Sequence, residues 1–286
     1  MMAELTFFSK TPITCPVCET SFYREEQRTG RGRLNAGELT EELRRTYLPS
    51  QKHGEVFPLL YPITVCPACY FGAAHADFLE TPPEIVPALK AEEQRRIADV
   101  STLFPSLDFT APRGLAEGCA SYFLAVASYE HFPKEFSPTF KRGLCCLRAA
   151  WTAGDLHRKQ TDDNFDYLSR LFYRKARFFY AHAIALEQTG KETLSGAANL
   201  GPDLDKNYGY DGLLYLSGLL EYRFGPTGDE EKRAIALQRA KRTIARIFGM
   251  GKASKNKPAA ILDNAREVYE EITEELGEGR KDPEKA

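Results

Sequence analysis

Residues 15–18 of the chain read CPVC, and residues 66–69 read CPAC. Each step places two thiols on one short turn, and the proline between them stiffens that turn because its ring fixes the backbone angle φ. Two such turns brought together form a tetrahedral set of four sulfurs, which suits Zn²⁺ with zinc–sulfur distances of about 2.3 Å. The repeated step therefore predicts a structural zinc ion with these ligands: Cys15, Cys18, Cys66 and Cys69.

Other uses of paired cysteines compete with structural zinc. A thioredoxin-like redox site needs a single CxxC step at the start of a helix, and two equivalent steps differ from that pattern. Rubredoxin-like iron uses the same four sulfurs, so the sequence leaves iron open, whereas iron–sulfur clusters usually have other spacings. Disulfides are disfavoured in a chain without a secretory signal. Four thiolates also leave no open metal position, which argues against catalytic zinc.

The composition limits the class of protein. The chain has 286 residues, enough for two domains, and its formal net charge of −2 gives no overall attraction to nucleic acid or anionic membranes. No apolar run approaches the roughly 18 residues of a membrane span. The first ten residues lack the apolar stretch and the cleavage pattern of a secretory signal. We therefore expect a cytoplasmic protein with no membrane partner.

The pattern of residues in the sequence changes near Pro82. Residues 1–80 contain repeated Xaa-Pro steps and short extended segments, whereas the later chain has apolar residues at helical spacing. We predict a mostly α fold: a small zinc-ribbon-like α+β module (1–80), a tetratricopeptide-like antiparallel helical array (81–277) and a disordered tail (278–286). Turn signals separate the expected helices. These helices cover residues 83–104, 112–131, 137–158, 163–189, 207–224, 228–249 and 258–277.

Small residues on these helices favour close helix pairs. Gly218 and Ala240 are examples of small residues where two neighbouring helices would cross, which is typical of tetratricopeptide repeats. No regular period of about 34 residues runs through the region, so an irregular helical bundle stays the alternative. The predicted core includes Phe140, Leu144, Trp151, Phe172, Phe179, Leu216 and Leu219.

The segments around the two cysteine steps resemble the bacterial family of domain of unknown function 2225. The similarity lies in residues 15–22, which read CPVCETSF, and in residues 61–74, which read YPITVCPACYFGAA. The resemblance implies a four-cysteine region followed by tetratricopeptide-like helices over most of the chain, and it implies no activity. The family usually has glycine after each second cysteine, where this chain has Glu19 and Tyr70. Glycine there would ease a left-handed turn.

The sequence contains no recognised catalytic motif. A nucleophile elbow, a Walker A loop, a dinucleotide-binding glycine pattern and an HExxH step are all absent from it. Acidic pairs such as Asp203 and Asp205 precede expected helices, where helix capping explains them. We therefore predict that the protein is not an enzyme.

Basic residues gather in the middle of the chain. Ten Lys or Arg occur with five Asp or Glu between Lys134 and Arg177. Such residues form either a solvated helical face or a groove that binds an acidic peptide or a C-terminal carboxylate through arginine forks. The predicted partner-binding residues, expected on one concave face, are Lys141, Arg142, Arg148, Arg170, Arg174 and Arg177.

These observations favour a non-enzymatic adaptor or scaffold, in which zinc stabilises the N-terminal module and the helices bind a protein or peptide. A nucleic-acid-associated zinc-ribbon protein is the alternative, because residues 24–53 include seven Lys or Arg. The five acidic residues in that segment weaken the alternative, since they dilute a phosphate-binding surface.

Overall fold

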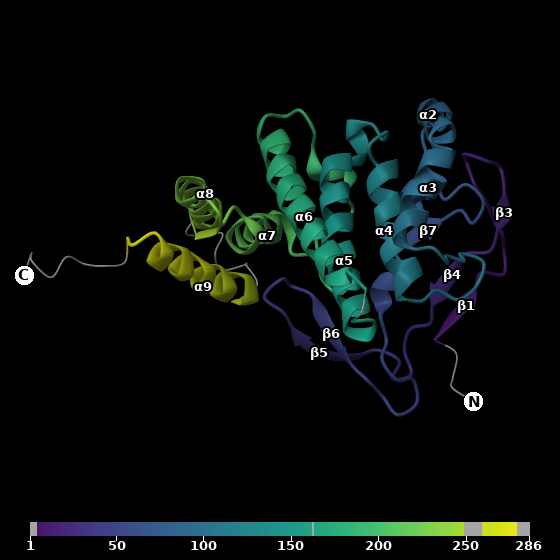
Figure 1. Ribbon diagram of the computed structural model, residues 1–286, viewed down its shortest axis with the longest axis horizontal. Helices are drawn as coiled ribbons and strands as arrows, with labels where there is room; N and C mark the ends of the chain where they lie inside the picture. The colour runs from purple at the N-terminus through teal and green to yellow at the C-terminus, as the bar shows by residue number, and fades with distance from the viewer. Residues whose placement is uncertain (1–4, 162, 249–258, 279–286) are drawn as a thin grey trace, which may run out of the picture.

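The protein is mostly helical, and its strands lie near its N-terminus. The computed structural model describes residues 5–161, 163–248 and 259–278. In these ranges every strand precedes residue 75, so the helical spacing predicted the later chain correctly. Figure 1 shows the strand-containing region beside and beneath a row of helices. The expected disordered tail falls on residues 278–286, of which 279–286 lie outside the described residues.

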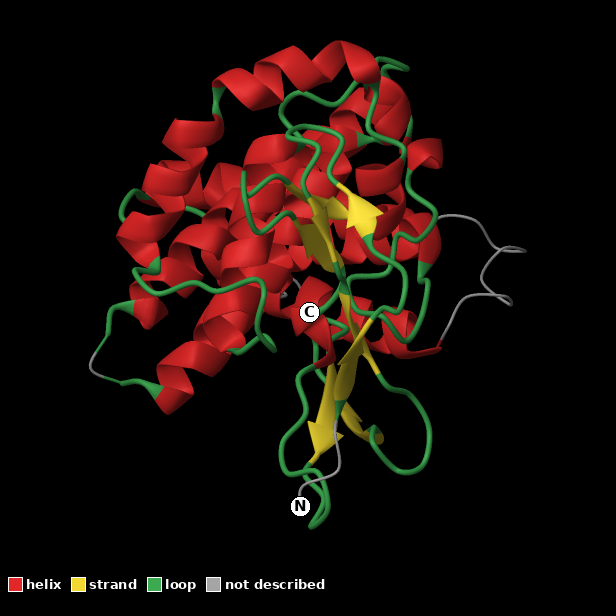
Figure 2. Ribbon diagram, turned by 90° about the vertical axis from the view of Figure 1, so that its right-hand side faces the viewer, coloured by secondary structure: helices red, strands yellow, loops and turns green. Residues whose placement is uncertain are grey.

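The strands form four two-stranded antiparallel pairs, β1 with β4, β2 with β3, β5 with β6, and β7 with β8. The β2–β3 hairpin is therefore nested inside the β1–β4 pair. Figure 2 shows the pairs along one side of the helices. The strand bounds are Thr6–Phe8 (β1), Ile13–Thr14 (β2), Ser21–Phe22 (β3), Glu25–Gln27 (β4), Asn35–Leu39 (β5), Arg45–Leu48 (β6), Ile63–Val65 (β7) and Gly72–Ala74 (β8).

From Pro83 onward the helices follow the predicted ranges closely, with one exception. The amphipathic run predicted over 83–104 is split at Glu92, where the backbone leaves the helical region with ψ near 5°. The α-helices are His75–Leu79 (α1), Val86–Ala91 (α2), Glu93–Leu103 (α3), Leu115–Ser128 (α4), Pro138–Lys159 (α5), Phe165–Gln188 (α6), Gly209–Phe224 (α7), Glu230–Phe248 (α8) and Ala259–Glu275 (α9). Short 3₁₀ turns are Pro58–Leu60 (η1), Pro83–Ile85 (η2), Lys134–Phe136 (η3) and Leu194–Gly196 (η4).

From α4 to α9, each helix packs against the next one along the chain. Figure 1 shows α4, α5 and α6 side by side, whereas α7 and α8 are seen nearly end on. Small residues allow the closest approaches, because a Cβ atom on Gly143 of α5 would lie 2.9 Å from the ring of Tyr180 on α6. A tetratricopeptide repeat stays a prediction.

One hydrophobic core runs through the N-terminal region and the helices. The Tyr122 hydroxyl of α4 donates to the Leu59 carbonyl oxygen at 2.6 Å, which docks η1 directly on the helix. The core is therefore continuous across residue 80, where the sequence predicts a domain boundary. Of the predicted core residues, Leu144 and Phe179 are partly buried against this core. The fully buried ones are Phe140, Trp151, Phe172, Leu216 and Leu219.

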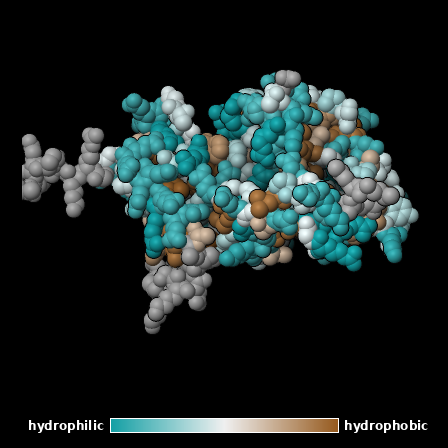
Figure 3. Space-filling model, turned by 90° about the horizontal axis from the view of Figure 1, so that it is seen from below, coloured by the Kyte–Doolittle hydropathy of each residue, from teal (hydrophilic) through white to brown (hydrophobic). Residues whose placement is uncertain are grey.

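Residues 35–48, which we call the strap, lie in the chain between the two cysteine turns and contact the helices. The strap comprises β5, β6 and the turn between them, and Figure 1 shows it below α5 and α6. The Tyr215 hydroxyl of α7 donates to the Glu41 carbonyl oxygen at 2.8 Å, and Leu43 is fully buried. Seen from below, hydrophilic residues cover most of the protein, and hydrophobic ones form separate patches (Figure 3). The insert between the cysteine steps is thus a structured excursion.

Candidate metal centre

Each cysteine pair lies in a turn that closes a short antiparallel hairpin. Residues 15–20 join β2 to β3, and residues 66–71 join β7 to β8. In both turns the main-chain N–H of the first cysteine donates to the carbonyl oxygen five residues later, at 2.9 Å. The residue after the second cysteine donates back to the first cysteine's carbonyl oxygen, at 2.9 and 3.0 Å. The two turns, hereafter the knuckles, therefore share one backbone hydrogen-bond pattern.

The four sulfurs converge, as the repeated step predicts. All four lie within 4.8 Å of one another. The Cys15 and Cys69 Sγ atoms are 3.6 Å apart, and those of Cys18 and Cys66 are 3.5 Å apart. These distances exceed the disulfide length of about 2.05 Å. They approach the edge of about 3.8 Å that a tetrahedron has when its metal–sulfur distance is about 2.3 Å. The cluster therefore fits one tetrahedral metal ion, and both knuckles contribute to it.

The crowded thiols change one another's proton affinity. The pKa of Cys66 is lowered, first by the neighbouring Cys15 thiol and then by the Cys69 thiol. The pKa of Cys15 is raised chiefly by Cys66 and that of Cys69 by Cys15 and Cys66, and burial raises both. A central cation would offset the repulsion among thiolates held this close together.

Helix α3 supports the second knuckle through a buried arginine. Arg96 is 5% exposed, and its Nε and Nη2 donate to the Cys69 carbonyl oxygen at 3.2 and 2.8 Å. Its Nη1 donates to the Leu89 carbonyl oxygen at 3.0 Å. One guanidinium thus ties the knuckle to α2 and α3. The sequence gives no signal for this role, because the acceptors are main-chain carbonyls that any residue carries.

Glu19 and Tyr70 adopt the left-handed conformation that glycine would ease. Their φ angles are 64° and 56°, a region that costs a residue with a side chain about 1–2 kcal/mol. The Tyr70 ring packs edge-on against Phe109, with 5.4 Å between the ring centres, and this contact offsets part of the cost. The departure from glycine therefore leaves both knuckle turns intact.

Other potential ligands lie apart from the knuckles. Within the described ranges, the four knuckle cysteines are the one group of three or more side chains close enough to share a metal. All seven cysteines are free thiols. Burial raises the pKa of Cys119 and Cys145 to about 12, as expected for small residues in a helical core. The His75 Nδ1 atom lies 3.1 Å from the Thr64 hydroxyl.

The six basic residues predicted to bind a partner lie in different places. Arg142 and Arg174 line one groove across α4, α5 and α6. Lys141 and Arg148 line a separate cavity beside α5.

The remaining two basic residues are paired on α6. Arg170 lies 3.0 Å from the Asp166 carboxylate one turn earlier, and Arg177 lies 3.0 Å from Glu221 of α7. The structure therefore divides the predicted residues between two depressions and two ion pairs, and their role in binding stays a prediction.

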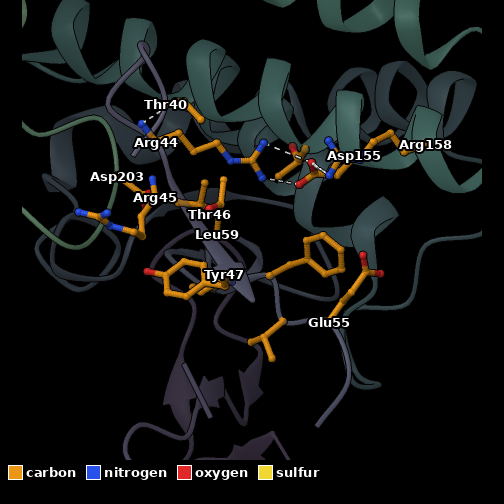
Figure 4. Close-up of a pocket in the computed structure, with 14 residues that line it drawn as sticks. Thr40, Arg44, Arg45, Thr46, Tyr47, Glu55, Leu59, Asp155, Arg158 and Asp203 are labelled. Atoms are coloured by element: carbon orange, nitrogen blue, oxygen red, sulfur yellow. Dashed lines mark hydrogen bonds and ion pairs between the residues drawn. The ribbon is translucent and has the colours of Figure 1, made fainter. Parts of the chain in front are cut away.

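A cavity of about 220 Å³ between the strap and α5 contains charges that pair with one another. Figure 4 shows Arg44 of the strap pointing toward Asp155 of α5, with Arg158 on the other side. Asp155 is 1% exposed and accepts from Arg44 at 3.2 and 2.5 Å and from Arg158 at 2.7 Å. The main-chain N–H of Arg45 donates to Asp203 at 2.7 Å. These groups hold the strap in place.

The comparisons with known proteins identify one bacterial family. A family model described as "Uncharacterized protein conserved in bacteria (DUF2225)" matches residues 8–272. The chain belongs to this family. The match spans both knuckles and most of α9, so the resemblance inferred from the cysteine segments is confirmed. No solved structure matches the chain.

This DUF2225 chain is also similar to a relative from Borreliella burgdorferi, which is described as an uncharacterized protein. The two are 43% identical over 276 residues, which cover 96% of this chain and 99% of the relative. Within the described residues, no helix has the length and apolar content needed to cross a lipid bilayer.

Proposed function

We propose that this protein is a non-enzymatic cytoplasmic adaptor. In this proposal a structural zinc ion joins the two knuckles, and the helices bind a protein partner through an exposed basic and aromatic groove. The observation that carries the proposal is unneutralised positive charge beside an exposed phenylalanine on α6.

The zinc part of the proposal rests on the donor set. Four sulfurs at tetrahedral spacing leave no position for a water or substrate, which suits a structural ion. Elemental analysis of protein purified without added metal should find about one zinc per chain. The Cys66→Ser variant should lose the metal, while Cys146→Ala, which removes a buried thiol outside the cluster, should retain it. If the analysis finds stoichiometric iron in place of zinc, the site is a rubredoxin-like iron centre.

The proposed binding surface crosses three helices. It is a groove of about 310 Å³, which we call the α6 groove, and its lining residues are Val126, Arg142, Leu171, Arg174, Lys175, Phe178 and Phe179. Phe178 is 58% exposed. An exposed large aromatic side chain among cations is typical of an interaction surface, since aromatic residues and arginine dominate binding energy at interfaces.

The charge of the α6 groove indicates the chemistry of its partner. Arg174 and Lys175 are exposed, and neither has a carboxylate within 4 Å in the described part of the chain. The Arg142 guanidinium stacks over the Phe179 ring, 4.6 Å from its centre, and pairs with the exposed Glu130. An acidic peptide segment with an apolar side chain complements this surface, because its carboxylates would face the cations and its side chain would contact Phe178.

A synthetic amphipathic peptide of Glu and Leu residues tests the α6 groove, with fluorescence anisotropy as the readout. The double variant Arg174→Glu, Lys175→Glu should bind this peptide at least about tenfold more weakly than the wild type. The matched control Lys232→Glu, Arg242→Glu reverses two exposed charges on α8 and should bind as the wild type does. Equal binding by both double variants would overturn the groove.

Capture from a lysate of the source bacterium separates the adaptor from its alternative. A discrete protein that is retained after nuclease treatment, and lost with the Arg174→Glu, Lys175→Glu variant, supports the adaptor. Nucleic acid that co-purifies with the wild type, and carries any captured protein with it, supports the nucleic-acid-associated protein instead.

A further inference from the structure

A cavity of about 400 Å³ lies where the second knuckle hairpin meets the helices. Strands β7 and β8, helices α1 and α5, Tyr129 directly after α4, and residues 196–204 contribute to its wall. Its apolar lining includes Ile63 of β7 and Phe140 and Leu144 of α5. This volume is within the range of small-molecule sites, about 300–1,000 Å³, and such sites combine an apolar wall with a few placed polar groups.

One of the two cations that line the cavity is already neutralised. Lys141 Nζ lies 2.8 and 2.7 Å from the two carboxylate oxygens of Asp77. The Tyr129 hydroxyl donates to the same carboxylate at 2.5 Å. This group is therefore a closed ion pair at one end of the cavity. Glu80, an exposed residue directly after α1, is the other acidic side chain in the lining.

The second cation, Arg148, is buried without a direct ion pair in the described residues, and the Asp203 carboxylate acts on it only from beyond 4 Å. It is 8% exposed, and its Nε donates to the Pro202 carbonyl oxygen at 2.8 Å. Its Nη2 lies 3.4 Å from the Asp203 carbonyl oxygen, but no carboxylate lies within 4 Å of the guanidinium in the described residues. The Asp203 carboxylate instead accepts from the main-chain N–H groups of Arg45 and Leu204 at 2.7 and 2.6 Å.

A buried charge without a direct ion pair is costly, and the cost falls when an anion binds beside it. We propose that this cavity binds a small monocarboxylic acid with an apolar body. The carboxylate pairs with the Arg148 guanidinium, and the apolar body lies against Phe140 and Leu144. Two main-chain carbonyls already orient the guanidinium, so the ligand does not need to order it. This site is independent of the α6 groove.

The position of the cavity links its ligand to the metal centre. The hairpin that forms one wall, β7–β8, also carries the knuckle with Cys66 and Cys69. Helix α5, which runs through the middle of the helices (Figure 1), also lines the cavity. A bound acid would therefore contact both the metal-binding region and the helices, and would stabilise their contact by mass action.

Calorimetric titration of the purified full chain tests this site, with octanoate and phenylpropanoate as probes. Octanol and phenylpropanol, which keep the apolar body and lack the charge, are the matched ligands. The expected result is one saturable site for at least one carboxylate. The Arg148→Met variant keeps an unbranched apolar stem without the charge, and it should bind that carboxylate at least about tenfold more weakly. Arg242→Met, at an exposed position of α8 outside the cavity, should bind it as the wild type does.

A second variant guards against misfolding of Arg148→Met. Ala76 is an exposed residue of α1 that lines the cavity, so Ala76→Trp should fill the space and abolish carboxylate binding without disturbing the core. Leu79→Trp, on the same helix but outside the cavity lining, should leave binding unchanged. The proposal is overturned if neither carboxylate binds the wild type. It also fails if Ala76→Trp binds as the wild type does, or if folded Arg148→Met retains full affinity.

Discussion

The knuckles and the strap belong to the same N-terminal region, yet different chemistry holds them. The knuckles meet through four thiols, and each hairpin supplies one sulfur to each close pair. The strap instead contacts the helices through charged and hydroxyl groups, of which Arg44 with Asp155 is the most buried pair. The helices therefore hold the middle of the insert, while the cysteine cluster holds its two ends.

The ends and the middle of the insert are therefore held by different forces. A metal in the cluster would fix positions 15 and 69 with respect to each other, because both residues supply ligand atoms. The strap contacts depend on α5, α6, α7 and residues 203–205, and on no cysteine. Changes at one place should therefore leave the other intact, and four predictions test how far that independence extends.

Metal removal should have the largest effect, confined to the knuckles. Structural zinc sites contribute on the order of 10 kcal/mol to the folding of small modules. After chelation, trypsin should cleave first at Arg24 and Arg28, near the first knuckle. Arg44 and Arg45 should stay protected, because the ion pairs of the strap remain. Mass spectrometry of timed digests identifies the sites. Equally early cleavage at Arg44 would show that the strap depends on the metal.

The candidate metal centre could be predicted because its ligands have a local signature. Two cysteines three positions apart mark a ligand-bearing turn by themselves, so only the pairing of the two turns required tertiary structure. The support of the knuckle by Arg96 could not be predicted, since a main-chain acceptor leaves no mark in the sequence. The helices from Leu115 onward were also predictable, because each repeats apolar residues at helical spacing.

The contacts of the strap could not be predicted from the sequence, for a physical reason. Arg44 and Asp155 are separated by 111 positions, and an ion pair imposes no periodicity on either partner. The sequence predicted the lining of the α6 groove in part. Arg142 and Arg174 were among the predicted partner-binding residues, whereas Lys175 and Phe178 were not. Phe178 stands next to Phe179, and spacing alone does not show which of two adjacent phenylalanines faces solvent.

The next largest effect should come from breaking the buried strap contact. Asp155→Ala leaves Arg44 without its carboxylate in a partly buried position, and removing one partner of a buried pair costs about 3–5 kcal/mol. Asp205→Ala removes the more exposed partner of Arg45, whose loss should cost less than about 1 kcal/mol. Chemical denaturation of both variants measures the two free energies of unfolding. Equal losses would mean that burial does not distinguish the two strap pairs.

A smaller effect should appear where the N-terminal region packs directly on α4. A Cβ atom on Gly118 would lie 2.2 Å from Leu60 Cδ2 and 3.2 Å from its Cα, so Gly118→Ala forces η1 away from the helix. Such overpacking typically costs about 1–3 kcal/mol.

Gly154→Ala is the matched control for this helix contact. The added Cβ would have only the Ser169 hydroxyl within 4 Å, at 3.8 Å. Alanine should therefore raise stability by up to about 1 kcal/mol through its better helix propensity. Thermal unfolding should show a lower Tm for Gly118→Ala and a higher Tm for Gly154→Ala than for the wild type. A stabilising Gly118→Ala would show that η1 moves freely on α4 and that the metal and the strap alone hold this region.

The smallest expected effect is a pH dependence located in the strap. Burial raises the pKa of Glu42 above its ordinary value of 4.5, although hydrogen bonds from Trp151 and Tyr173 act in the opposite direction. The folded state therefore keeps this proton to a higher pH than the unfolded state does. From about pH 4.5 up to the raised pKa, the free energy of unfolding should fall as pH rises. Glu42→Gln does not titrate and should lack this decline.

The measurement is the difference in Tm between the wild type and Glu42→Gln across that pH range. The wild type should lose stability relative to the variant as pH rises, and the difference should become constant above the raised pKa. Glu38→Gln removes one negative charge from an exposed strap position and should follow the wild type. Parallel curves for the wild type and Glu42→Gln would contradict the prediction. Chelation should leave the difference unchanged, because the strap and the metal centre are held separately.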